Sequence, residues 1–153
     1  MSPEVAMYGS VQDLLAEKGR QVYTVRKSTP VIDAVRAMNH KGVGALLVMD
    51  GDRAVGIFTE RDVLRRIVDV DRDPAITHVV EVMTPDPQSV LLETRVADAM
   101  DLMTSRRFRH LPVIEDGQVV GMVSIGDVMR WVTMHQQDHI DHMTDYITGR
   151  APA

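Results

Sequence analysis

The chain has 153 residues, of which 44% are hydrophobic and 25% are charged, and its formal net charge is -5. This composition is typical of a folded globular protein and excludes disordered and fibrous classes, while the acidic balance disfavours a nucleic-acid partner, because phosphate binding needs a basic face. The sequence has no cysteine and no apolar run long enough to cross a membrane, so we expect a cytoplasmic protein without disulfides.

The first half of the chain predicts a lead-in helix followed by a strand, a helix, two strands and a further helix. Helices are indicated by apolar residues spaced three and four positions apart, and the two adjacent strands by short apolar runs on either side of an Asp-Gly turn. A proline at the first helical position marks the start of the central helix. The predicted elements are a helix ending near Gly19, a strand over 22–25, a helix over 30–41, strands over 45–49 and 54–58, and a helix from Thr59.

The second half repeats this order, and the offset between equivalent residues is 65 positions, as between Val25 and Val90. Two copies of one supersecondary unit normally pack about a pseudo-twofold axis, so a ligand site should occur as a related pair. We therefore predict an α/β (α+β) fold of two tandem units, each with its own lead-in helix. The predicted boundaries are 10–68 for the first unit, 69–78 for a linker, 79–132 for the second unit and 133–153 for a C-terminal helical extension.

Each repeat has a hydroxyl residue at the end of its last strand and an aspartate three positions later. This spacing is typical of a helix capping box, in which each side chain satisfies one free backbone amide. A glycine three positions before the hydroxyl and the positive end of the following helix also suit a phosphate, while the carboxylate one turn into the helix suits the two hydroxyls of a ribose. Both interpretations apply to Thr59 and Asp62, after Gly56, and to Ser124 and Asp127, after Gly121.

These features resemble a tandem pair of cystathionine beta-synthase (CBS) domains, the Bateman module. The likeness covers the chain from about Val11 to about Trp131 and rests on two copies of glycine, two apolar residues, Ser or Thr, two variable residues and Asp. It includes the lead-in Val82-Met83-Thr84 and the phrase Arg109-His110-Leu111-Pro112-Val113. The length of the chain is similar to that of small stand-alone bacterial members.

The resemblance implies a regulatory or sensor module rather than an enzyme. It implies that adenosine nucleotides (AMP, ADP or ATP, with NAD or S-adenosylmethionine as alternatives) bind in clefts between the two units and alter conformation or partner affinity, and that no further cofactor is required. Asp62 and Asp127 would hold ribose hydroxyls, and Thr59 and Ser124 would contact phosphate. Further residues expected around the nucleotide are Thr24, Val25, Arg61, Ser89, Val90, Arg109, His110, Leu111 and Pro112.

The two predicted sites differ in sequence, because the first repeat has Gly44-Ala45 where the second has Arg109-His110. A guanidinium binds phosphate through a planar fork that glycine lacks, so we expect the sites to be unequal.

The last helix is predicted to continue for about six turns, which would leave an apolar stripe uncovered on a monomer. Homodimerisation through this helix, or folding back over its own domain, would cover the stripe. His135, His139 and His142 lie on it at spacings that suit zinc or nickel, although a solvated polar face or a dimer rim is the commoner explanation. Two other functions stay open: a ligand-independent dimerisation or scaffold module for an unidentified client protein, and, less favoured, metal binding through this tail.

Overall fold

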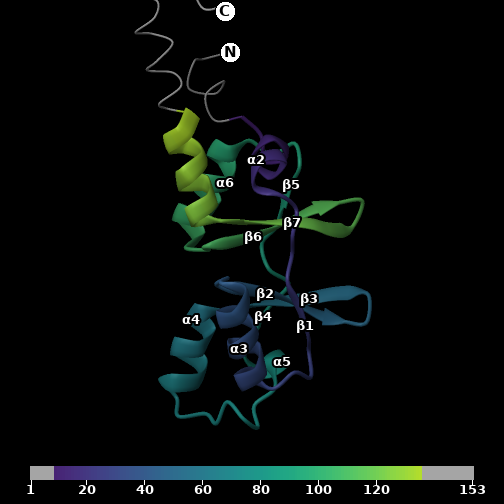
Figure 1. The fold of residues 1–153 in the computed structure, drawn as a ribbon, viewed down its shortest axis with the longest axis vertical. Helices are drawn as coiled ribbons and strands as arrows, with labels where there is room; N and C mark the ends of the chain where they lie inside the picture. Colours follow the sequence, from purple (N-terminus) through teal and green to yellow (C-terminus); the bar gives the residue numbers. More distant parts are fainter. Residues whose placement is uncertain (1–8, 136–153) are drawn as a thin grey trace, which may run out of the picture. The chain divides into compact units, whose positions relative to one another are not determined.

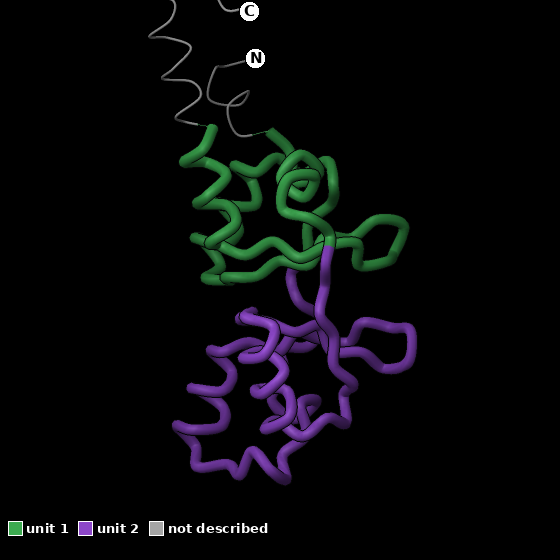
Figure 2. The backbone as a smooth tube through the Cα atoms, viewed as in Figure 1, with its two compact units in different colours: residues 1–20, 89–153 green, residues 21–88 purple. Residues whose placement is uncertain are grey.

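The structure is a computed structural model that describes residues 9–135 of the chain. These residues fall into two compact units (Figures 1 and 2), unit 1 formed by residues 9–20 with 89–135 and unit 2 formed by residues 21–88. The chain therefore passes from unit 1 to unit 2 and back again. Both units combine a small sheet with helices, which confirms the predicted α+β class with two tandem units.

Unit 2 contains a four-stranded sheet in the order β1-β2-β3-β4. β1 and β2 are parallel, and the other neighbours are antiparallel. The hairpin of β2 and β3 was predicted from its apolar runs and Asp-Gly turn. The short β4 was not predicted, because a strand of two residues, one of them a proline, gives no recognisable pattern. The strands are β1 (Thr24–Arg26), β2 (Ala45–Asp50), β3 (Arg53–Thr59) and β4 (Thr84–Pro85).

The helices of unit 2 place one apolar face each against this sheet. α3 (Val31–Lys41) buries Val31, Ala34 and Met38 on one side and ends at Gly42, whose φ of 67° suits a residue without a Cβ. α4 (Glu60–Val63) continues as a π-helix, η1 (Leu64–Val68), and α5 (Val79–Val82) follows. The core of unit 2 consists of Val31, Ala34, Met38, Leu46, Val48, Phe58, Ile67, Val79 and Val82.

Unit 1 repeats the arrangement with a three-stranded sheet in the order β5-β6-β7. Its strands are β5 (Val90–Leu91), β6 (His110–Glu115) and β7 (Gln118–Ser124), and its helices are α2 (Val11–Lys18), α6 (Val96–Arg106) and a helix that covers residues 125–135. The duplication extends to irregularities: the register shifts between Val48 and Met49 in unit 2 and between Val113 and Ile114 in unit 1. The core of unit 1 consists of Val11, Leu14, Leu15, Val90, Leu92, Val96, Ala99, Met103, Leu111, Val113, Val123, Val128 and Trp131.

The two lead-in helices are exchanged between the repeats. α2, which precedes the first repeat in sequence, packs in unit 1 on α6 and β7, whereas α5, which precedes the second repeat, packs in unit 2 on β3. The sequence boundaries place each lead-in helix with the repeat that follows it, so the compact units are composed differently from the sequence repeats.

Matching backbone hydrogen bonds hold both exchanged helices. Val11 N–H donates to the Thr94 carbonyl at 2.8 Å in unit 1, and Val79 N–H donates to the Thr29 carbonyl at 2.9 Å in unit 2. Thr29 and Thr94 are equivalent in the 65-residue repeat. The exchange is thus a symmetric feature of the duplicated fold.

The glycines before each hydroxyl residue allow the lead-in helices and the segments that follow them to approach the sheets. A Cβ on Gly121 would lie 2.8 Å from Leu15 Cδ1, and a Cβ on Gly56 would lie 2.5 Å from Met83 Sδ. The sequence interpretation associated these glycines with a phosphate-binding site. In the structure, the space beside each glycine is filled by a side chain of the same unit.

The C-terminal extension falls mainly outside the described residues, as do His139 and His142 and the remaining part of the predicted six-turn helix. Within residues 9–135, no helix is both long and apolar enough to cross a membrane.

Candidate functional site

In unit 2 the aspartate of the repeated motif lies at the junction of β3 and α4. Thr59 caps α4, and its backbone N–H donates to Asp62 Oδ2 at 2.9 Å, while Asp62 N–H donates back to Thr59 Oγ1 at 3.4 Å. The capping box predicted from the sequence is therefore present. The other carboxylate oxygen, Oδ1, lies 3.7 Å from Arg66 Nε, and Asp62 is 6% exposed.

In unit 1 the same arrangement recurs at the end of β7. Ser124 N–H donates to Asp127 Oδ2 at 2.8 Å, and Asp127 N–H donates to Ser124 Oγ at 3.1 Å. Asp127 Oδ1 lies 3.8 Å from Arg130 Nη1. Each motif thus uses one carboxylate oxygen for the helix cap and directs the other toward an arginine one turn along the chain.

A lysine distinguishes the second motif from the first. Lys18, the last residue of α2, places its ammonium 2.5 Å from Asp127 Oδ2 and also donates to the carbonyl of Met122. Arg66 in unit 2 instead donates to the carbonyls of Val82 and Met83 at 2.9 and 2.7 Å. The sequence interpretation missed Lys18, because its contact with Asp127 depends on the exchange of the lead-in helices.

The two carboxyl groups consequently have opposite pKa shifts. Burial raises the pKa of Asp62, and the hydrogen bonds from Thr59 and the charge of Arg66 only partly offset it. Burial also acts to raise the pKa of Asp127, but the hydrogen bond from Lys18 and the backbone of Ser124 outweigh it, so this pKa is lowered. The two carboxyl groups are therefore electrostatically unequal, and the difference arises at Lys18 rather than at Arg109 and His110, from which the sequence predicted it.

His110 lies beside the second motif, since it pairs with Ser124 across β6 and β7. Burial lowers the pKa of its imidazole, and the nearby Asp127 carboxylate partly opposes that effect. Arg109 is exposed, and its carbonyl accepts a hydrogen bond from Ile125 N–H at 2.8 Å. The corresponding bond in unit 2 joins Glu60 N–H to the Gly44 carbonyl at 3.1 Å. Unit 1 therefore brings Arg109, His110, Ser124 and Asp127 to the same end of its sheet.

The remaining residues expected around a nucleotide have different degrees of access. Thr24 is exposed, and Val25, Arg61 and Ser89 are half-buried, so these four residues offer some accessible surface. Val90 and Leu111 belong to the core of unit 1, with 4% and 0% exposure, and Pro112, next to Leu111 on β6, is also buried. The side chain of Leu111 in this structure serves packing.

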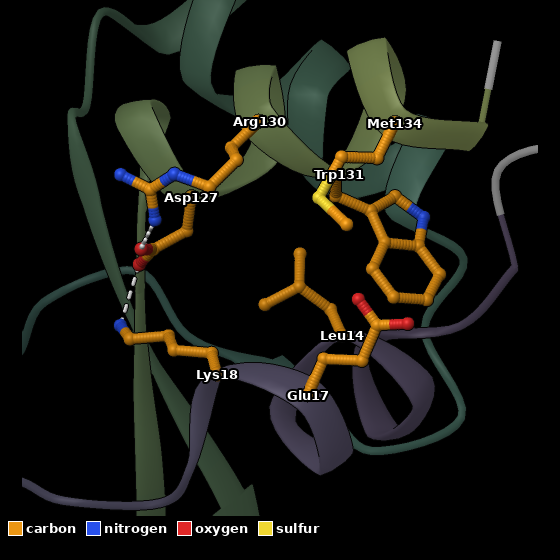
Figure 3. Close-up of a pocket in the computed structure, with 7 residues that line it drawn as sticks. All are labelled: Leu14, Glu17, Lys18, Asp127, Arg130, Trp131 and Met134. Carbon is orange, nitrogen blue, oxygen red and sulfur yellow. Dashed lines mark hydrogen bonds and ion pairs between the residues drawn. The ribbon is translucent and has the colours of Figure 1, made fainter. Parts of the chain in front are cut away.

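A pocket of about 270 Å³ lies between α2 and the helix over residues 125–135 (Figure 3). Lys18 and Arg130 approach Asp127 from opposite sides at one end of it, while Trp131 and Met134 line the other end. The lining residues are Leu14, Glu17, Lys18, Asp127, Arg130, Trp131 and Met134.

His135, one of the three weak metal candidates, stacks on Trp131 with ring centroids 3.8 Å apart, and its Nε2 lies 4.0 Å from Glu17 Oε1. Within the part of the chain that the structure describes, no group of three acidic or histidine side chains is arranged to hold a metal ion. The described contacts of His135 therefore join the helix over residues 125–135 to α2.

The sequence matches the family model of the CBS domain twice, over residues 11–69 and 79–133. The chain belongs to the CBS domain family. The repeat and the fold derived above are thus those of a CBS pair, and CBS-domain proteins of this kind are generally regulatory or sensor modules.

Similar CBS proteins come from several kingdoms. The chain is 37% identical over 150 residues to the mitochondrial CBS domain-containing protein CBSX3 of Arabidopsis thaliana. The aligned region covers 92% of this chain and 72% of the relative. A putative signal-transduction protein with CBS domains from Burkholderia ambifaria MC40-6 is 44% identical, with a TM-score of 0.76 over 80% of this chain and 91% of the other. A hexameric CBS-CP12 protein from bloom-forming cyanobacteria is 29% identical, with a TM-score of 0.70 over 78% and 66% of the two chains. In several longer relatives this chain spans about a fifth of the full length.

The opposite pKa shifts predict opposite effects of two amide substitutions on stability. Ionised Asp127 stabilises the fold above its ordinary pKa of 3.8, and this contribution is lost as the pH falls through the lowered folded-state pKa. The contribution of Asp62 to the free energy of unfolding depends on pH in the opposite direction. The protonated carboxyl stabilises the fold at low pH, and this stabilisation is lost as the pH rises through the raised pKa. At pH 7 we expect Asp127→Asn to lower the free energy of unfolding by about 1–2 kcal/mol, because Lys18 loses its charged partner, and Asp62→Asn to raise it.

Urea unfolding of both variants at pH 7 and pH 3 measures this difference. The cost of Asp127→Asn should shrink at pH 3, which lies below the ordinary pKa of 3.8, because the carboxyl of the unfolded wild type is then mostly protonated. A larger loss from Asp62→Asn than from Asp127→Asn at pH 7 would contradict the assignment.

Proposed function

We propose that this CBS pair is a sensor of adenosine nucleotides in which Asp62 and Asp127 bind the ribose hydroxyls of AMP, ADP or ATP. The observation that carries the proposal is the recurrence of one geometry in both units: a capped helix start whose aspartate keeps one oxygen beside an arginine rather than within the cap. A carboxylate oxygen in this position accepts hydrogen bonds from a diol, and the adjacent guanidinium suits a phosphate. NAD and S-adenosylmethionine share the adenosine group and are the alternative ligands.

Ligand binding would regulate by shifting a conformational equilibrium. A nucleotide that binds one conformation more tightly than another stabilises that conformation by the difference in binding free energy. This mechanism needs neither a catalytic residue nor a further cofactor, so we assign the protein a regulatory rather than an enzymatic role. A cytoplasmic location remains part of this proposal.

Calorimetry with AMP, ADP, ATP, NAD and S-adenosylmethionine tests the proposal on the wild type and on the double variant Asp62→Asn, Asp127→Asn. Asparagine keeps an oxygen for the helix cap but removes the charge that strengthens the hydrogen bonds to the diol. We expect the double variant to lose at least about tenfold in affinity, since a hydrogen bond to a charged group contributes about 1.5–3 kcal/mol. No binding of any of the five ligands to the wild type at millimolar concentration would overturn the sensor role and favour the scaffold.

Self-association is a second proposed property. Leu64 and Val68, one turn apart on η1, are 65% and 62% exposed, and Met129, which is equivalent to Leu64 in the repeat, is 57% exposed. Apolar side chains at the same outward position of both repeats suit a symmetric homodimer. The hexameric CBS-CP12 relative supports this proposal.

Sedimentation equilibrium of the wild type and of the variant Leu64→Glu, Met129→Glu tests the proposed dimer. We expect a dimeric wild type and a monomeric variant, because burying two glutamates in an apolar interface is unfavourable. A dimer that persists in the variant but is lost on truncation after Trp131 would place the interface in the C-terminal extension instead.

A further inference from the structure

The ammonium of Lys18 occupies the carboxylate that the proposed ribose site of unit 1 would use. The Asp127 side chain is 11% exposed and that of Lys18 is 30% exposed, and Figure 3 shows the lysine reaching Asp127 from α2. The same ammonium also donates to the Met122 carbonyl of β7. Lys18 is thus held by two acceptors, both in the strand and helix that present Asp127.

Unit 2 has no equivalent of this lysine in its lead-in helix. When the two lead-in segments are aligned on Val11 and Val79, Lys18 corresponds to Asp86, an acidic residue that lies beyond the end of α5 at Val82. The cation nearest Asp62 among the described ion pairs is Arg66, which lies 3.7 Å from Oδ1 and donates its hydrogen bonds to two backbone carbonyls elsewhere. Arg66 therefore lies farther from Asp62 than Lys18 lies from Asp127, at 3.7 Å against 2.5 Å.

A ribose diol and the Lys18 ammonium would bind the same carboxylate, since Lys18 lies on Asp127 Oδ2 and the second oxygen, Oδ1, faces Arg130. A diol binds a carboxylate by donating two hydrogen bonds, so an ammonium already bound to that carboxylate must be displaced or must share it. Because Lys18 is tethered by α2, its effective concentration at Asp127 is high and constant. An untethered ligand that needs Asp127 binds against that competition.

We propose that Lys18 is an intramolecular latch that blocks the Asp127 site and makes the Asp62 site the first to bind adenosine compounds. This inference rests on the nucleotide-binding function proposed above and adds its regulation. Lys18 is the last residue of α2, immediately before the chain passes into unit 2. When Lys18 leaves Asp127, the C-terminal end of α2, from which the chain enters unit 2, loses this contact.

Adenosine is the decisive probe, because it carries the diol but no phosphate that Lys18 could attract. Calorimetry in an Asp62→Asn background isolates the Asp127 site, and Lys18→Met then removes the ammonium while keeping most of the apolar stem. We expect Lys18→Met to increase adenosine affinity at least about tenfold, the effect of removing one competing charge-assisted hydrogen bond. The matched control is Lys27→Met, which removes a lysine paired with Asp50 at 3.0 Å in unit 2 and should leave the affinity unchanged.

The outcomes separate the latch from the function on which it rests. Unchanged, weaker or undetectable adenosine binding in the Lys18→Met variant overturns the latch, as does an equal gain in the Lys27→Met control. If ATP binds the wild type normally while the latch test fails, the sensor function stands without the latch. If neither ATP nor adenosine binds the wild type or any variant, the sensor function itself fails. Circular dichroism and thermal unfolding of each variant confirm that α2 remains folded.

Discussion

Replacing Leu15 with alanine is expected to lower the free energy of unfolding of unit 1 by about 3 kcal/mol, within the range for a buried leucine. Leu15 is 1% exposed, and its Cδ1 atom packs over Gly121 of β7, so alanine would leave a cavity between α2 and the sheet. The loss should appear in the second repeat, although Leu15 precedes the first. Urea unfolding followed by the fluorescence of Trp131, the single tryptophan of the chain, reports on this core directly.

Gln12→Ala is the matched control, because Gln12 is exposed on the same helix. It should change the unfolding free energy by less than about 0.5 kcal/mol. The backbone amides of β2 and β3 should keep their protection from hydrogen exchange in the Leu15→Ala variant, since the core of unit 2 is covered by α5 and not by α2. Loss of protection in unit 2 with an unchanged Trp131 transition would show that α2 belongs with the first repeat.

Alanine at Gly56 is expected to cost about 3 kcal/mol, and alanine at the equivalent Gly121 only about 1 kcal/mol, at the two ends of the range for overpacked cores. The added Cβ at position 56 would lie 2.7 Å from the backbone carbonyl of Thr84 as well as 2.5 Å from Met83 Sδ. A carbonyl in a strand pair cannot rotate away. At position 121 the obstacle is the end of the Leu15 side chain at 2.8 Å, which can change rotamer.

Urea unfolding monitored by far-ultraviolet circular dichroism gives both values, and hydrogen exchange locates the weakened strand. Gly44→Ala serves as a control, because its Cβ would meet only the carboxylate end of Glu60 at 3.3 Å. Equal costs at positions 56 and 121 would show that β4 moves freely with the substitution, which would contradict its pairing with β3.

The duplicated part of the fold was predictable because its signals are local. The apolar run at β2, the Asp-Gly turn and the spacing of α3 each depend on neighbouring residues, and the structure confirms the hairpins and helices within a few residues. The exchange of α2 and α5 could not be predicted. Both helices present apolar residues at similar spacing, and choosing between two equivalent cores depends on contacts distant in sequence. The π-helical turn of η1 likewise has no distinct sequence pattern.

The candidate site was only partly predictable for the same reason. The pairs Thr59 with Asp62 and Ser124 with Asp127 lie on one helical turn each, so their geometry follows from sequence spacing alone. Lys18 approaches Asp127 across more than a hundred residues, and only the fold brings the two together. Whether the aspartates bind a ribose stays a prediction for the calorimetry described above.

The composition of the two units also determines the order in which they can form during synthesis. Unit 2 is an uninterrupted segment, residues 21–88, and can fold as soon as that segment has left the ribosome. The apolar face of α2, with Val11, Leu14 and Leu15, is synthesised first, but the strand it covers, β7, is synthesised near the end of the described chain. At about 5–20 residues per second, this face waits about 5–20 s for its partner. During this interval the apolar residues of α2 are uncovered in the nascent chain, while unit 2 can already be folded.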